Sequence, residues 1–231
     1  MIGWMAFAAA ISAQAAQPEH RMPAAAETAV PSTPLATVSG NVVTHPVEKV
    51  RVRVPDKAAY AGSERFNLYG VADAEIHVFV EADSAKSMQR LYWVQFESYL
   101  PSNDHRYNYF DGNTRFDLWG TPTWLVWGPR LTSAPARAGG DRESVMRILS
   151  RAGYTVPPEV LNVRMVQMLD DPQGTGRGRR ELMIIYSEDL APTGKKVAEL
   201  AVDGKVIEEA FQPLEKPLIE RATTAVSVER F

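Results

Sequence analysis

The chain has 231 residues, of which 45% are hydrophobic and 23% are charged, and its formal net charge is −3. These values are typical of a globular protein that is long enough to bury a core. Proteins that depend on phosphate contacts are usually basic, so the charge argues against nucleic acid as a partner. The absence of cysteine excludes disulfides, thiolate metal ligands and a cysteine nucleophile.

The first residues have the layout of a secretory signal peptide. Residues 2–11 form an apolar run, and the AQA at residues 13–15 is a small-residue cleavage site. The layout lacks the usual Lys or Arg before the run, and a buried alanine-rich helix is the alternative. We expect residues 1–15 to be removed and the protein to be exported to the periplasm or the cell exterior. The run is too short for a transmembrane anchor, and none is expected in the mature chain.

Residues 16–47 are rich in proline, alanine and threonine and show no apolar periodicity. Such a composition cannot offset its ordering entropy by burial, so the sequence predicts a disordered linker. Residues 48–231 are then expected to form a single α+β domain. This domain opens at residues 49–54, where valine alternates with Lys or Arg, a pattern that predicts a half-buried edge strand.

The remaining elements follow in series. Strands are predicted, in chain order, at residues 65–69, 75–83, 90–100, 114–119, 123–127, 161–169 and 180–188. Residues 142–152 carry an apolar stripe at helical spacing, with Asp141 as the expected N-cap and Gly153 as the C′ residue. A short helix at 217–224 and a closing strand at 225–228 complete the chain.

This order predicts an α+β fold that is mainly antiparallel β-sheet, with one well-capped packed helix and a short helical C-terminal region. The phrases RLYWVQFESYLP with YNY, and ELMIIYSEDLAPTG, resemble phrases that recur in an uncharacterised family of exported bacterial proteins. The resemblance covers residues 65–231. It implies a common fold and export, and it supplies no catalytic residues to carry over.

The candidate site is an aromatic-rich face of the predicted sheet. We expect residues 75–83 and 90–100 to form a hairpin in which even-numbered residues pair with even-numbered ones, so that His77 lies opposite Gln95 or Glu97. One surface would then hold seven candidate ligand-binding residues: His77, Phe79, Glu81, Trp93, Gln95, Glu97 and Tyr99. Ring faces beside polar groups can hold a small molecule or a protein partner. Ordinary cross-strand pairs on a half-solvated face are the alternative.

Enzymatic alternatives use the two histidines of the expected domain. His77 could exchange a proton with Glu97 or Glu81, and His105 could do so with Asp104, although residues 102–106 have the composition of a turn. His20 and His45 fall in or beside the leader, so a three-histidine metal site is not expected. No cofactor motif is present, and the sequence favours a binding protein that is not an enzyme.

Overall fold

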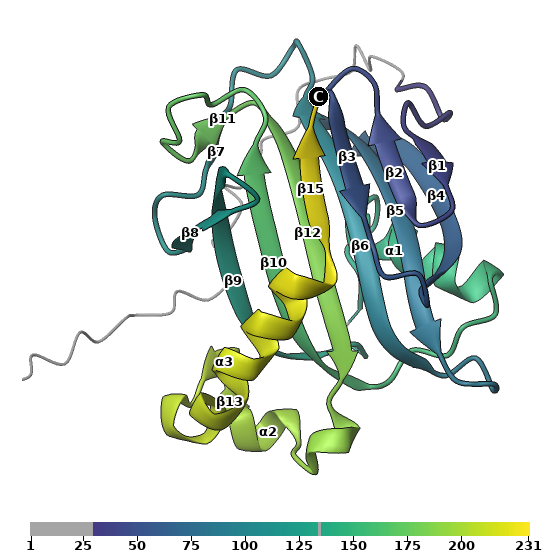
Figure 1. Ribbon diagram of the computed structural model, residues 1–231, viewed down its shortest axis with the longest axis vertical. Helices are drawn as coiled ribbons and strands as arrows, with labels where there is room; N and C mark the ends of the chain where they lie inside the picture. The colour runs from purple at the N-terminus through teal and green to yellow at the C-terminus, as the bar shows by residue number, and fades with distance from the viewer. Residues whose placement is uncertain (1–29, 134) are drawn as a thin grey trace, which may run out of the picture.

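The computed structural model describes residues 30–133 and 135–231. The expected signal peptide and the first part of the expected linker lie outside these residues. The fold is α+β, as predicted, and it is built mainly from antiparallel sheets. Three layers are visible in Figure 1: a small sheet with α3 at the front, a large sheet in the middle and α1 behind it.

The large sheet has seven strands in the order β4-β5-β6-β12-β10-β9-β8. In that order the strands are Ala59–Leu68, Ala72–Ala82, Met88–Tyr99, Arg180–Asp189, Glu159–Met168, Thr121–Leu131 and Thr114–Leu118. All neighbouring strands pair antiparallel. The long apolar strand β12 is central, as its pattern predicts, because a strand covered on both faces is apolar on both faces.

The small sheet has the order β1-β2-β3-β15. Its strands are Thr37–Ser39, Val42–His45, Val50–Arg53 and Ser227–Arg230. The linker prediction is therefore wrong at its C-terminal end, because residues 37–45 bury Val43 and His45 and complete a sheet. The edge-strand prediction is also wrong, since β3 is flanked by β2 and β15. Its valines are buried and its arginines are exposed, as the alternation requires.

Short elements complete the fold. They are β7 (Tyr107–Asn108), β11 (Arg177–Gly178), β13 (Ala201–Val202), β14 (Lys205–Val206), the 3-10 turn η1 (Ala191–Thr193) and the helix α2 (Val197–Leu200). The C-terminal helix α3 spans Glu208–Ala225, which is longer than predicted and includes two prolines. It buries Phe211, Leu218 and Ala222 along one face, and this apolar stripe anchors it on the large sheet beside β15 (Figure 1).

Helix α1 spans Asp141–Arg151 and buries Val145, Ile148 and Leu149. The predicted cap is wrong by one position, because Gly140 is the N-cap and no side chain caps the helix. Asp141 is the first helical residue, where its carboxylate accepts a hydrogen bond from the backbone N–H of Arg142. A negative charge in the first turn still favours the helix dipole. The helix packs on β4 and β5, at one side of the large sheet.

Candidate functional site

The pairing of β5 with β6 divides the seven predicted site residues between two faces of the large sheet. His77 lies opposite Val94, and Trp93 lies opposite Val78. The predicted even-to-even register is therefore wrong: odd residues of β5 pair with even residues of β6. Because a shift of one residue exchanges the faces of a strand, His77, Phe79 and Glu81 point to the small sheet. Trp93, Gln95, Glu97 and Tyr99 point to the α1 side.

His77 is closed into the core between the sheets and is 1% exposed. Its Nε2 lies 2.8 Å from Oε1 of Glu75, and its Nδ1 lies 3.4 Å from the hydroxyl of Tyr60. The Glu75 carboxylate also accepts the backbone N–H groups of Leu35 and Ala36. Burial alone would raise the pKa of Glu75, but these hydrogen bonds together lower it. The arrangement attaches residues 35–36, just before β1, to β5.

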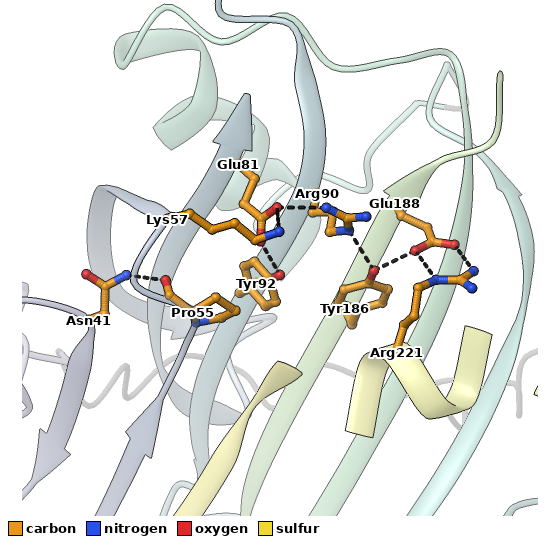
Figure 2. Close-up of polar contacts among 9 residues, drawn as sticks. All are labelled: Asn41, Pro55, Lys57, Glu81, Arg90, Tyr92, Tyr186, Glu188 and Arg221. Atoms are coloured by element: carbon orange, nitrogen blue, oxygen red, sulfur yellow. Dashed lines mark hydrogen bonds and ion pairs between the residues drawn. The ribbon is translucent and has the colours of Figure 1, made fainter. Parts of the chain in front are cut away.

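Glu81 belongs to a polar network at one end of the same interface. Its carboxylate accepts hydrogen bonds from Arg90 and Tyr92 and pairs with Lys57. Figure 2 shows the network continuing from Arg90 to Tyr186. From there it continues through Glu188 to Arg221 of α3 (Figure 2). The large sheet and α3 are thereby linked, and each of these carboxylates has a cationic partner, which reduces the cost of burying it.

The structure therefore does not bring His77 together with either predicted carboxylate. Glu97 is on the other face of the sheet, and Glu81 is committed to the network of Figure 2. Phe79 packs its ring 5.0 Å from that of Tyr60 and is fully buried. The three predicted residues that point to the small sheet, His77, Phe79 and Glu81, are therefore buried between the two sheets.

Three of the four predicted residues on the α1 side form a hydrogen-bonded chain. The Trp93 indole donates to Gln95 at 2.9 Å, and the Gln95 amide donates to Glu97 at 2.7 Å. The Tyr107 hydroxyl donates to the other Glu97 oxygen. The Tyr107 ring stacks on that of Tyr99, with 4.3 Å between centroids. The loop after β6 thus folds back and covers this end of the face.

The carboxyl group of Glu97 lies beside that of another residue, because Glu97 is directly opposite Glu181 of β12. Both residues are buried, with 8% and 2% exposure. Burial raises the pKa of Glu97 to about 7, although the hydrogen bond from Tyr107 opposes this. Burial, and then the charge of Glu97, raise the pKa of Glu181 well above its usual range. Two adjacent carboxyls with little water retain a proton rather than ionise together.

Beside α1 the same sheet face borders a cavity of about 780 Å³. The helix covers β4 and β5, so the faces of β6, β12, β10 and β9 beyond it form the cavity floor. Apolar groups from these strands and from α1 line it: Met88, Leu91, Trp93, Val126, Trp127, Val145, Met146, Leu149, Val160, Met183 and Ile185. Trp93 is the one predicted site residue among the lining residues.

The polar lining comes from β9, β10, β12, the start of α1 and the loop at residues 111–113. It includes Arg130, Asn162, Arg164, Ser187, Asp141 and Arg142. The sequence-based search missed all of these, and it missed Glu181. A signal was present in EVLNVRMVQM, where Asn162 and Arg164 fall on one side of a strand that is internal to the sheet. A cation on an internal strand usually has a charged or polar partner, because burying an unpaired charge is costly.

The remaining sequence-based candidates have structural roles. The backbone N–H of His105 donates to the side chain of Asn103, which supports the predicted turn. His45 is buried in β2 with its ring 4.4 Å from that of Phe96, so placing it beside the leader was wrong. Within the described ranges, no group of three His, Asp or Glu side chains is arranged to hold a metal ion, and no helix is long and apolar enough to cross a membrane.

Comparison with known proteins gives no match to a family model, a curated protein or a solved structure. The geometry of the site alone must therefore support a function.

Proposed function

We propose that this protein is an exported, non-enzymatic binding protein that holds one small, largely apolar molecule in the cavity beside α1. The observation that carries the proposal is the cavity itself. Its volume of about 780 Å³ falls within the range of small-molecule sites, roughly 300–1,000 Å³. Its walls are mostly aliphatic and aromatic side chains with a few polar groups on one side, which is the usual composition of such sites.

A small molecule fits this face better than a protein partner does. Trp93, Gln95 and Glu97 are buried beneath α1 and the loop that carries Tyr107, so they offer no flat surface to a macromolecule. The alternative of enzyme chemistry at His77 has no support from the geometry, because the imidazole is buried and hydrogen-bonded to Glu75.

The cavity can be tested with the neutral fluorophore N-phenyl-1-naphthylamine, whose emission rises in apolar surroundings. We expect saturable binding to the wild type and loss of it in Met146→Trp, because Met146 lines the cavity and an indole there would fill part of it. Ser150→Trp is the matched control, since Ser150 is an exposed residue of the same helix. Absence of binding to the wild type, or equal binding to both variants, would count against the site.

Export rests on the layout of the first residues and on the resemblance to exported proteins. Expression of the full chain in a bacterium, followed by sequencing of the mature N-terminus, tests it. We expect the mature chain to begin at Ala16 and to be released with the periplasmic or extracellular fraction. A chain that retains residues 1–15 and stays in the cytoplasm would contradict export without affecting the cavity.

A further inference from the structure

Arg130 is a cation of the cavity wall without a carboxylate partner among the described residues. It lies near the end of β9, beyond Leu125, where the pairing with β8 ends. Its guanidinium donates to the backbone carbonyl of Pro129 at 3.1 Å. The side chain is exposed, and part of that exposed surface lines the cavity. The group is thus available to a molecule that enters.

Arg164 is a second cation, deeper on the same wall. It projects from β10, places its guanidinium 5.5 Å from the ring centre of Tyr109, and makes a long 3.4 Å contact with Asn113. Its Nε is buried and finds no hydrogen-bond acceptor among the described residues. A buried donor without an acceptor costs about 1–3 kcal/mol, and the residue itself lines the cavity, so its positive charge is only partly satisfied by the protein.

The charges around the two arginines differ. Arg164 lies near Glu97, Glu181 and Asp141, and its charge opposes the rise in their pKa values. Arg130 has no such neighbour. Although the residue is exposed, the surrounding wall removes part of the water around its guanidinium, and this partial desolvation, followed by repulsion from Arg164, lowers its pKa. An anion near Arg130 would relieve this repulsion.

The other charged groups of the lining do not cancel this local excess. They are Arg142, Asp141 and Asp111. Arg142 donates to the carbonyl of Thr132, and Asp111 is exposed and bonded to Asn108. The lining therefore has three arginines against two aspartates, in a protein whose net charge is −3. The positive excess belongs to the cavity and not to the molecule as a whole.

We propose that the ligand is an amphipathic anion, with its acidic group at the guanidinium groups of Arg130 and Arg164 and its apolar body against Trp93 and α1. This assignment rests on the small-molecule site proposed above and names the chemical class of its ligand. A carboxylate or sulfonate on an aromatic or aliphatic body satisfies both parts of the cavity. A guanidinium recognises such groups through directed, charge-assisted hydrogen bonds.

Two fluorophores that differ by one charged group test the assignment. They are N-phenyl-1-naphthylamine, which is neutral, and 8-anilinonaphthalene-1-sulfonate, which carries a sulfonate on the same ring system. We expect the wild type to bind the sulfonate more tightly. Arg130→Gln should weaken sulfonate binding about tenfold or more, as expected for loss of a charge-assisted hydrogen bond. Binding of the neutral probe should change little, and this also shows that the variant keeps its cavity.

Two further variants refine the experiment. Arg130→Lys keeps the charge and should retain part of the preference for the sulfonate. Arg53→Gln removes an exposed cation from the small sheet, on the opposite side of the large sheet, and should leave both affinities unchanged. An equal loss in Arg53→Gln would mean that the preference is a general charge effect and would overturn the assignment.

The two proposals fail in different ways. If neither probe binds the wild type, the small-molecule site itself is wrong. If the neutral probe binds but the sulfonate binds no better, or if Arg130→Gln leaves sulfonate binding unchanged, the site stands and the anionic class of its ligand is wrong.

Discussion

Replacing Glu97 by glutamine tests the buried carboxyl pair next to the cavity. The substitution removes the titrating group and keeps the hydrogen bonds. The new amide can accept from Gln95 with its oxygen and donate to the Tyr107 hydroxyl with its nitrogen, where the carboxylate accepted from both. The cross-strand neighbour Glu181 remains in place. The variant therefore removes one ionisation and, with it, the charge that helps to raise the pKa of Glu181.

The magnitude follows from the pKa of Glu97. Burial raises it from 4.5 to about 7 in the folded protein, so the folded state binds this proton more tightly than the unfolded chain does. The free energy of unfolding then falls as the pH rises through 4.5, and the fall levels off above about 7. Each unit of pKa difference corresponds to about 1.4 kcal/mol, so the full effect is about 3 kcal/mol.

The assay is urea unfolding of the wild type and Glu97→Gln at about pH 5 and about pH 8, where the linkage argument predicts the largest contrast. The stability of the variant relative to the wild type should rise by up to about 3 kcal/mol between these conditions. Glu64→Gln is the control. The arginines beside Glu64 lower its pKa below 4.5 against the effect of burial, so its contribution is lost only in more acidic solution, and the difference between Glu64→Gln and the wild type should be nearly the same at both pH values. A pH-independent difference between Glu97→Gln and the wild type would refute the reasoning.

Three further predictions concern neighbouring contacts. Tyr107→Phe removes the O–H that lowers the pKa of Glu97, so carbon-13 NMR should show this carboxyl titrating at a higher pH than in the wild type. Arg221→Ala breaks the two hydrogen bonds to Glu188, and α3 should lose hydrogen-exchange protection while stability falls by about 1–2 kcal/mol. His77→Leu breaks a buried hydrogen bond and should cost about 1–3 kcal/mol in thermal or urea unfolding; binding of the neutral probe should be unaffected, whereas a loss of binding without unfolding would give His77 a functional role.

Most strands of the large sheet could be predicted because their apolar residues follow a clear period. The helix α1 was equally visible, and only its cap was misplaced by one residue. Residues 37–45 were missed because β1 and β2 are short and lie among prolines and threonines. Their order comes from tertiary contacts such as the bonds of Glu75 to Leu35 and Ala36, and local composition carries no information about such contacts.

The site was misjudged through one error of register. A bulge between Glu81 and Ala82 interrupts the pairing of β5 with β6, and such a bulge inserts one residue without leaving a mark in the alternation of either strand. The even numbering of the apolar residues in both strands therefore could not show which sides of β5 and β6 lie on the same face of the sheet. Because both faces of this sheet are covered, buried residues occur at odd and even positions alike, as in Phe79 and Val80.

The location of the cavity follows from the difference in width between the large sheet and the single helix α1 that packs on one of its faces. Neighbouring strands are about 4.8 Å apart, so a sheet of seven strands is about 29 Å wide. A single helix with its side chains covers only about 10–12 Å of that width. The small sheet and α3 cover one face of the large sheet, whereas α1, over β4 and β5, is the one described helix on the other face, and the loop that carries Tyr107 covers only one end of it. The face of β12, β10 and β9 beyond the helix is therefore covered less completely, and this is where the cavity of about 780 Å³ lies.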